Sequence, residues 1–270
     1  MNKTFFYKYR GINNYDDLSK DFSLDALFKS YAIFSGRKNF KDLFDSKIYF
    51  EYPSSEQLLS LMQNPRIDRD KKYIMKNWIA NGKFTSVGND FFKNLGKGLN
   101  EIIDAYPIFS VSISNTSNLL WAHYASSHKG FCIEFDFDEI EQPQKVTYQK
   151  DIASVSLLDF LRYNLGIDTS TEFGIKMKNA LLVKIEEWRD EREYRWILSD
   201  KMGIVPKGEK YIKIEYAPRK VKSIIFGCRM LDDVKKYIIK NLPFTTVFKQ
   251  AIETKNTIEV RDFNSNEYIL

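Results

Sequence analysis

The sequence predicts a mixed α+β fold, with strands scattered along all 270 residues instead of gathered in one half. Aromatic residues make up 15% of the chain, and such rings favour strands and stacking surfaces. Several segments alternate apolar and polar side chains with the two-residue period of a half-buried strand. No repeat, low-complexity tract or linker interrupts them. We therefore expect one α+β domain over residues 1–270.

The expected strands are short and rich in β-favouring residues. The segment FCIEFDFD alternates most cleanly, with Phe131 on its apolar face and Glu134 on a polar face that we expect to meet solvent. The segment PIFSVSIS places Ser110 and Ser112 on one strand face. The predicted strands cover residues 4–10, 47–52, 107–114, 131–137, 191–198, 211–216, 222–227, 245–251 and 257–263.

Helices are expected between these strands. Ser54-Ser55-Glu56 is typical of a cap for a helix that begins near Gln57, and Ser117 or Asn118 can cap a short helix through Ser126. The four glycines within residues 82–98 predict a connection instead of a regular element. The other predicted helices cover residues 15–34, 68–81, 151–165, 172–188 and 231–240.

Composition limits the classes of function. A net charge of +5 is too mild to identify a nucleic-acid binder, although it permits an anionic ligand. His123 and His128 are the only histidines, which argues strongly against a structural zinc site. Cys132 and Cys228 lie in apolar runs and are expected to be buried free thiols in a reducing cytoplasm. With no long apolar run and no signal peptide, we expect a cytoplasmic protein without a membrane partner.

The segment EEWRDEREYRWIL, from Glu186 to Leu198, interleaves opposed charges with tryptophan. If residues 191–198 form a strand, Glu191, Glu193 and Arg195 share one face. The plain interpretation is an exposed row of ion pairs, each contributing roughly 0–1 kcal/mol. The other interpretation is that one of the carboxylates performs chemistry.

The order of three elements favours chemistry. Arg10-Gly11 ends the first aromatic strand, Ser110 and Ser112 follow in a hydroxyl-rich strand, and Glu191 and Glu193 form a Glu-x-Glu pair. This order resembles the arginine–serine–glutamate arrangement of ADP-ribosyltransferases. The resemblance implies a split, curved, mixed β core flanked by helices. It also implies that NAD is a substrate, whose nicotinamide bond is cleaved and whose ADP-ribose passes to a protein or nucleic-acid acceptor, as in a toxin or phage-defence effector.

The same resemblance implies a role for each residue. Arg10 would bind the NAD diphosphate or a nearby ribose through paired hydrogen bonds. A serine would hold the catalytic glutamate and the nicotinamide ribose. Glu193 would stabilise an oxocarbenium-like transition state, and Glu191 would orient the acceptor. We add His123 and Tyr124 of the short helix as further NAD-binding candidates; the alternative for His123 is a core histidine bonded to backbone.

A second resemblance covers nearly the whole chain. The blocks LLWAHYASSHKGFCIEFD, VKIEEWRDEREYRW and YAPRKVKSIIFG resemble a bacterial family of unknown function. Where many members carry Asn-Asp-Pro-Phe after the second strand, this chain has Tyr-Pro-Ser-Ser-Glu, which implies a different substrate loop. The matching residues are Trp121, His123, Tyr124, His128, Gly130, Phe131, Cys132, Phe135, Trp188, Glu191, Glu193, Tyr194 and Arg195.

Two other functions remain open from the sequence. One is a non-catalytic module that binds nucleic acid or protein through aromatic and basic side chains. The other is a metal-dependent nuclease with paired carboxylates, although the usual acidic spacing is not evident. Geometry separates these alternatives, because the NAD hypothesis requires Arg10, one serine of residues 110–114, and Glu193 to meet in one cleft.

Overall fold

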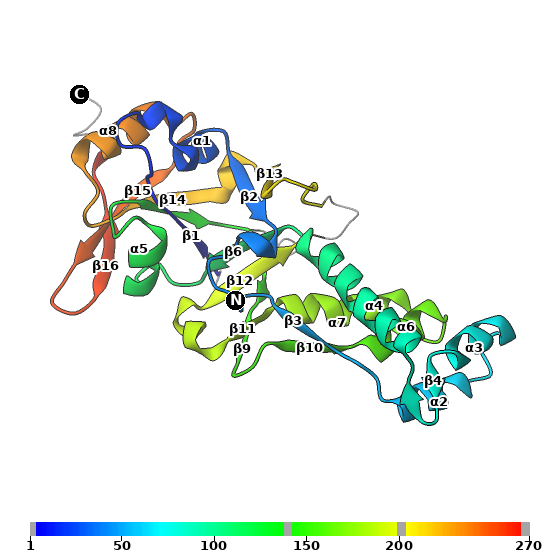
Figure 1. The fold of residues 1–270 in the computed structure, drawn as a ribbon. Coiled ribbons are helices and arrows are strands. Elements are labelled where there is room, and N and C mark those ends of the chain that lie inside the picture. Colours follow the sequence, from blue (N-terminus) through cyan, green and yellow to red (C-terminus); the bar gives the residue numbers. More distant parts are fainter. Residues whose placement is uncertain (1–3, 138–141, 199–203, 266–270) are drawn as a thin grey trace.

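One large mixed sheet organises the fold, and helices are attached to it along the whole chain (Figure 1). The computed structural model describes residues 4–137, 142–198 and 204–265. Within these residues the strand order is β13-β2-β6-β1-β7-β14-β15-β16, and β12 pairs with both β6 and β8. This arrangement confirms the expected mixed α+β class. The strands of this sheet are β1 (Phe6–Arg10), β2 (Tyr31–Ser35), β6 (Ile108–Ser112), β7 (Phe131–Phe135), β8 (Gln144–Lys145), β12 (Glu193–Ile197), β13 (Tyr211–Glu215), β14 (Val221–Phe226), β15 (Val247–Glu253) and β16 (Ile258–Asp262).

Helices and short strand pairs make up the rest. The described helices are α1 (Phe22–Phe28), α2 (Ser55–Met62), α3 (Arg69–Lys76), α4 (Ser86–Asp104), α5 (Asn118–Tyr124), α6 (Leu157–Asn164), α7 (Ser170–Leu181) and α8 (Asp232–Asn241), with the 3₁₀ turns η1 (Leu18–Lys20), η2 (Arg37–Asn39), η4 (Glu186–Glu191) and η6 (Pro218–Lys220). The strand pairs outside the large sheet are β3 (Ile48–Glu51) with β10 (Ala153–Ser156), β9 (Thr147–Gln149) with β11 (Val183–Ile185), and β4 (Ile79–Ala80) with β5 (Lys83–Phe84).

The large sheet forks at β6. One edge of β6 pairs along its whole length with β12 in antiparallel register. The other edge is shared between β2, which pairs at Ile108, and β1, which pairs at Ser112. Between these two points the carbonyl of Ser110 accepts a hydrogen bond of 2.7 Å from Lys8 Nζ. Ser110 therefore lies where β1 and β2 part, and this fork positions the site described below.

Both faces of the sheet are covered. Helices α1 and α8 place Leu24 and Ile238 in a cluster with phenylalanines of β1, β7 and β14. Helix α5 covers the opposite face, where the buried ring of Trp121 meets Tyr9 edge-on at 5.0 Å between centroids. The two-residue alternation of β1 explains how one short strand contributes to both clusters.

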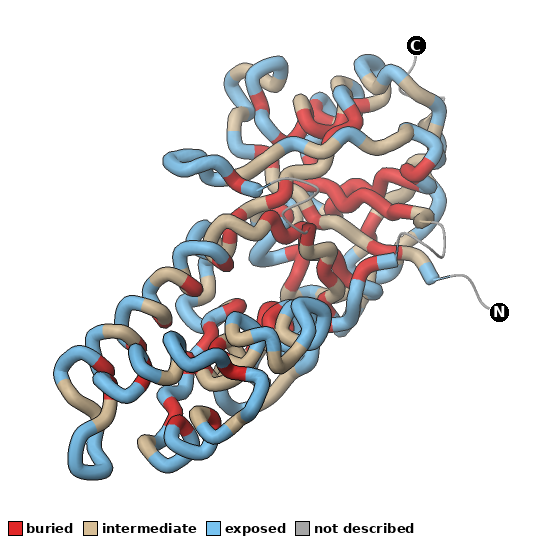
Figure 2. Tube along the Cα trace, turned by 90° about the vertical axis from the view of Figure 1, so that its right-hand side faces the viewer, coloured by how far each residue is buried: buried red, intermediate tan, exposed pale blue. Residues whose placement is uncertain are grey.

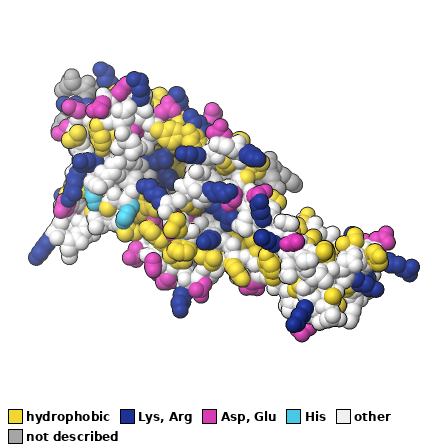
Figure 3. All heavy atoms as spheres, viewed as in Figure 1, with side chains coloured by type: hydrophobic (Ala, Val, Ile, Leu, Met, Phe, Trp, Pro, Cys, Tyr) yellow, Lys and Arg dark blue, Asp and Glu magenta, His cyan; other side chains and the backbone are white. Residues whose placement is uncertain are grey.

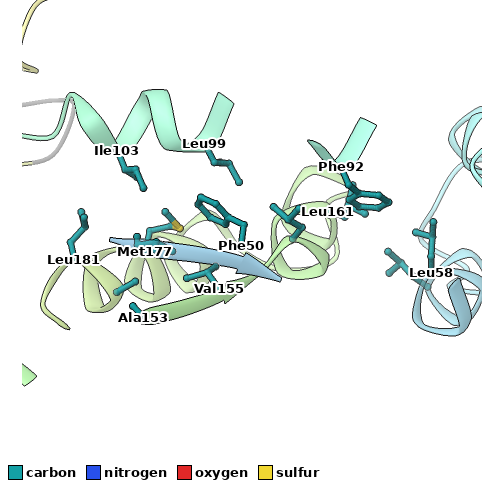
Figure 4. Packing of buried hydrophobic residues seen from close by; sticks show 14 of the residues in the cluster. Phe50, Leu58, Phe92, Leu99, Ile103, Ala153, Val155, Leu161, Met177 and Leu181 are labelled. Atoms are coloured by element: carbon teal, nitrogen blue, oxygen red, sulfur yellow. The ribbon is translucent and has the colours of Figure 1, made fainter. Parts of the chain in front are cut away.

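A helical arm extends from the sheet and has a core of its own. It comprises β3, β10 and helices α2, α3, α4, α6 and α7 (Figure 1). Figure 2 shows that buried residues concentrate around the sheet and continue as a narrower band into the arm. Figure 4 shows how Phe50 of β3 lies between Leu99 and Ile103 of α4 on one side and Met177 of α7 on the other. Helices α4 and α7 thus stabilise the β3–β10 pair by burying their apolar residues against it.

Local sequence signals account for several of these helix boundaries. The expected cap before α2 is present: Ser54 forms a reciprocal capping box with Gln57, and the helix begins at Ser55, two residues before its expected start. Ser117 caps α5 by accepting a hydrogen bond from the backbone N–H of Leu120.

Packing overrides other local signals. The predicted connection over residues 82–98 is wrong, because α4 runs from Ser86 to Asp104 with Thr85 as its N-cap. Its buried stripe, which includes Phe92 and Leu99, outweighs the helix-weakening effect of its glycines.

Four predicted helices are shorter than expected because strands lie inside them. Residues 68–81 hold α3 only as far as Lys76, and β4 begins at Ile79. Residues 15–34 hold only η1 and α1 before the chain turns at Ser30, which has a φ of 53°, and enters β2. Residues 151–165 begin with β10 before α6, and α7 ends at Leu181 before β11 and η4. Short β-branched and apolar runs satisfy both patterns, so pairing partners distant in sequence decide between them.

The expected solvent-facing position of Glu134 is also wrong. Glu134 is buried in β7, where it accepts hydrogen bonds from Tyr7 and Ser223 and pairs with Lys249 at 2.7 Å. The alternation of apolar and polar residues placed Glu134 on a solvent-facing side of β7. In the structure, β14 and β15 continue the sheet next to β7, and their residues Ser223 and Lys249 contact Glu134. The thiol of Cys132 is free and buried, whereas that of Cys228 is free and partly buried.

Candidate functional site

A cavity of about 330 Å³ lies at the fork of the sheet, between β1, β6 and the segment that joins η4 to β12. On the face shown in Figure 3, lysine and arginine side chains gather around the middle of the molecule. The residues that line the cavity are Tyr7, Lys8, Tyr9, Arg10, Ile33, Ser35, Asn39, Phe40, Lys41, Asp42, Asp45, Ile108, Ser110, Val111, Ser112, Leu120, Tyr124, Lys184, Glu191 and Glu193.

The cavity brings together most of the residues that the sequence singled out. They come from four separate segments of the chain: β1, β6, α5, and the junction of η4 with β12. The geometric condition set above is therefore met, since an arginine, a serine and the second glutamate share one cavity. The predicted site residues that line it are Arg10, Ser110, Ser112, Tyr124, Glu191 and Glu193.

Two predicted site residues lie elsewhere. Gly11 packs against Ser126, because a Cβ at this position would come within 2.3 Å of the Ser126 hydroxyl oxygen. The side chain of His123 is exposed, with its ring centre 6.4 Å from that of Trp188. Neither residue lines the cavity, so Gly11 acts through close packing behind β1 and His123 lies on the surface beside the site.

Lys184 is the hub of a buried charge cluster that sequence analysis missed. Its Nζ lies 2.5 Å from Glu191, 3.0 Å from Glu193 and 3.3 Å from Asp45. Burial alone would lower the pKa of Lys184, but the three carboxylates outweigh it and raise that pKa above the usual lysine value. Lys184 therefore stays protonated and lets two glutamates two residues apart share one site.

Arg195 holds the second glutamate from the other side. Its Nε donates to Glu193 Oε1 at 2.7 Å and its Nη2 to Glu193 Oε2 at 3.0 Å, while Nη2 also lies 2.7 Å from Asp45. Nη1 completes the set by donating to Ser46 Oγ and to the Leu181 carbonyl. The side chain of Arg195 is fully buried, so the charged row that the plain interpretation placed in solvent lies inside the protein.

Glu191 and Glu193 reach the cluster by different backbone routes. The expectation that both belong to one strand is wrong, because Glu191 is the last residue of η4 and β12 begins at Glu193. Arg192 between them is left-handed, with a φ of 48°. Ser112 fixes this corner, since its hydroxyl donates to the Glu191 carbonyl at 2.7 Å. The Glu193 N–H donates to the Tyr148 hydroxyl at 2.8 Å.

The environments of the two glutamates push their pKa values apart. Burial would raise the pKa of Glu193, but Arg195 and Lys184 reverse this effect and hold it well below its usual range, with a further contribution from the Ser110 hydroxyl. Burial raises the pKa of Glu191, and the nearby charge of Glu193 adds to the rise against the opposing effects of Lys184 and Tyr124. Glu193 is thus a permanent anion, whereas Glu191 is a group that can exchange a proton.

Each carboxylate of the cluster contacts at least one cation of the chain. Among the described residues, no group of three or more His, Cys, Asp or Glu side chains is placed to hold a metal ion. Within that part of the chain, no helix is long and apolar enough to cross a membrane.

Comparison with known protein families gives a match over one segment of the chain. Residues 120–196 match the model of a family described as a protein of unknown function (DUF2971). This match confirms the resemblance to a family of unknown function. The matched segment runs from α5 to β12 and contains Tyr124, Lys184, Glu191, Glu193 and Arg195. Searches among curated proteins and among solved structures gave no match.

Proposed function

We propose that this protein cleaves the nicotinamide–ribose bond of NAD and passes the ADP-ribose to an acceptor, as an ADP-ribosyltransferase or as an NAD glycohydrolase. One observation carries this proposal. One cavity is lined by Arg10, Ser110, Glu191 and Glu193, which come from three distant segments of the chain. These are the residue types that such chemistry uses. The chain thereby supplies a cation for phosphate, a hydroxyl and two carboxylates at a single place.

The permanent charge of Glu193 suits the bond-breaking step. When the bond between the ribose C1′ and the nicotinamide nitrogen breaks, the electron pair leaves with nicotinamide and positive charge develops on the ribose. A fixed carboxylate in a site with little water stabilises that charge. The ion pairs with Arg195 and Lys184 keep Glu193 ionised and immobile, so it needs no reorganisation during the reaction.

The raised pKa of Glu191 suits the second step. An acceptor hydroxyl, or water in the hydrolytic reaction, must lose a proton as its oxygen attacks C1′. Glu191 can take that proton because its pKa lies above that of an ordinary glutamate. Tyr124 donates a hydrogen bond of 2.8 Å to Glu191, which orients the carboxylate towards the cavity that both residues line.

The net charge of the cluster is consistent with these roles. Three carboxylates, Asp45, Glu191 and Glu193, face the two cations Lys184 and Arg195. When all five are ionised, one negative charge remains uncompensated, which is the sign that stabilises an oxocarbenium ion.

A metal-dependent nuclease fits the donor set less well. A divalent cation bound by Glu191 and Glu193 would have to compete with Lys184, which already contacts both carboxylates at 2.5 and 3.0 Å. A metal ion bound to these carboxylates would lie close to the Lys184 ammonium, and two positive charges so close together repel strongly in a buried site. The ion pairs therefore favour an organic cation, such as the ribosyl transition state, that needs proximity without coordination.

The test follows NAD labelled separately on the nicotinamide and on the adenylate. The protein should release nicotinamide, and in the presence of a cell extract it should transfer the adenylate label to macromolecules. Glu193→Gln should abolish release, because loss of one electrostatic stabiliser costs about 10²–10³ in rate. Glu191→Gln should reduce transfer more than release. Glu187→Gln is the matched control, since Glu187 lies in the same η4 turn and is exposed.

The outcomes separate the candidate functions. If NAD binds without nicotinamide release under any condition, a non-catalytic binding module replaces the proposal. If NAD is cleaved and Glu193→Gln and Glu187→Gln behave alike, the glutamate cluster is structural and the reaction occurs elsewhere on the protein.

A further inference from the structure

Two cations of β1 contrast with the paired charges of the cluster. Lys8 and Arg10 are two residues apart and so project to the same side of the strand. Both line the large cavity, and both also line a small neighbouring cavity of about 10 Å³ beside Tyr31 and Tyr216. They are therefore positioned side by side at the fork.

Neither cation has a carboxylate partner in the part of the chain that the structure describes. The ammonium of Lys8 donates only to the Ser110 carbonyl at 2.7 Å and lies 4.7 Å from the centre of the Phe109 ring. The guanidinium of Arg10 forms no hydrogen bond or ion pair within the described residues, although it has five N–H donors. A partly buried arginine without a partner is costly unless an anion completes its hydrogen bonds.

The surrounding charges explain why this pair is poised for an anion. Burial, followed by the positive charge of Arg10, lowers the pKa of Lys8 to about 7 against the raising effects of Glu193, Glu191 and Cys132. Within the described residues the two glutamates make no direct contact with Lys8 and instead contact Lys184. A ligand with two negative charges would supply the missing counter-charge.

We propose that Lys8 and Arg10 together form a diphosphate subsite at the fork of the sheet, and that Lys8 takes up a proton when the diphosphate binds. The proposal rests on the function proposed above, which already assigns Arg10 to phosphate, and extends it by adding Lys8 as the second cation of the subsite. Arg10 binds one phosphate through two parallel N–H donors, and Lys8 binds the other as a point charge while keeping its bond to the Ser110 carbonyl.

The direction of the proton exchange follows from the lowered pKa. Below about pH 7 Lys8 is already charged in the free protein, so a diphosphate changes little. Above that pH the free amine is largely neutral, and a bound diphosphate favours its charged form. Binding above about pH 7 therefore requires the uptake of up to one proton at Lys8, and affinity decreases as pH rises.

ADP-ribose is the probe, because its diphosphate is a diester and keeps its charge near neutral pH. Its binding is measured by titration calorimetry at about pH 8 in two buffers of different ionisation enthalpy, which gives the number of protons taken up. Lys8→Met and Arg10→Met should each weaken binding about 10- to 100-fold, as expected for a lost charge-assisted hydrogen bond. Lys83→Met, at an exposed position of β5, is the control and should bind as the wild type does.

Lys8→Arg makes the test specific. Arginine keeps the positive charge but does not titrate near pH 8. This variant should retain most of the affinity and lose the proton uptake, which also guards against a fold defect in Lys8→Met. Unchanged affinity in Lys8→Met, or full proton uptake in Lys8→Arg, would overturn the proposal.

Failure of this subsite and failure of the proposed function give different results. If the protein cleaves NAD while Lys8→Met and Arg10→Met bind ADP-ribose normally, the subsite is wrong and the function stands. If ADP-ribose binds with the expected variant and proton effects while NAD is never cleaved, the subsite stands and the catalytic proposal falls.

Discussion

The sharpest prediction compares Glu193→Gln with Glu191→Gln in the free energy of unfolding. The two positions are two residues apart, 6% and 3% exposed, and both contact Lys184, so size, burial and chemistry of the change are matched. Their charge environments differ, however, because Glu193 is held ionised whereas Glu191 is pushed towards protonation. The same substitution should therefore have very different costs.

The expected costs follow from the contacts. Glu193 accepts two hydrogen bonds from Arg195 and one from Lys184. A glutamine has one acceptor oxygen and an NH₂ group, so at least one N–H of Arg195 would face another donor inside the protein. Breaking one partner of such a buried pair costs about 3–5 kcal/mol. For Glu191→Gln we expect a loss of only about 0.5–1.5 kcal/mol, because removing a disfavoured charge offsets part of the weakened contacts with Tyr124 and Lys184.

Urea unfolding at about pH 7, followed by circular dichroism and tryptophan fluorescence, measures both values. The pH dependence gives a second check on Glu193. Its depressed pKa stabilises the fold above the unfolded glutamate value of 4.5, and this stabilisation is lost as pH falls through the folded pKa. The gap between wild type and Glu193→Gln should therefore narrow in acid. Equal losses for both variants at neutral pH would refute the assignment of pKa values that are shifted in opposite directions.

Three further predictions concern the same cavity. ADP-ribose transfer should fall as pH drops through the raised pKa of Glu191, because a protonated carboxyl cannot accept the acceptor's proton, and a pH–rate profile of Glu191→Gln should lack this limb. Ser112→Ala should lower the free energy of unfolding in urea by about 1–3 kcal/mol, because the buried Glu191 carbonyl loses its 2.7 Å donor. Gly130→Ala should lower the melting temperature and weaken ADP-ribose binding, since its Cβ would come within 2.1 Å of the Arg10 carbonyl; Gly98→Ala, where no atom lies within 4 Å, should instead raise the melting temperature slightly.

The predictability of the fold depended on whether a signal was local. Capping by Ser54 and Ser117 was evident from the sequence, because a cap needs only residues within one helical turn. The strand at Tyr31–Ser35 was missed because its identity depends on pairing with Tyr211–Glu215 far along the chain. Helix α4 was missed because its glycines are a local signal against a helix. The residues that pack against its buried stripe lie far away in the sequence and give no local signal.

The candidate site shows the same division. The order of Arg10, the serines and the glutamates indicated residues that do meet in one cavity. The cations that set their charge states were not anticipated. Lys184 carried one usable signal, since it lies between two apolar residues of a short strand immediately before an acidic segment. Asp45 carried none, because nothing in its neighbourhood indicates that it meets Arg195.

The shared ammonium of Lys184 links stability and chemistry in this cluster. Two carboxylates so close together cannot both remain ionised in a buried site unless a cation lies between them. Arg195 adds a second cation, but of the two glutamates it contacts only Glu193, so the compensation is unequal. This inequality, and not any intrinsic difference between two glutamates, separates a permanent anion from a proton acceptor. One arginine is therefore enough to give the two glutamates of a Glu-x-Glu pair different acid–base roles. Here that arginine is Arg195, which lies two residues after Glu193 in β12.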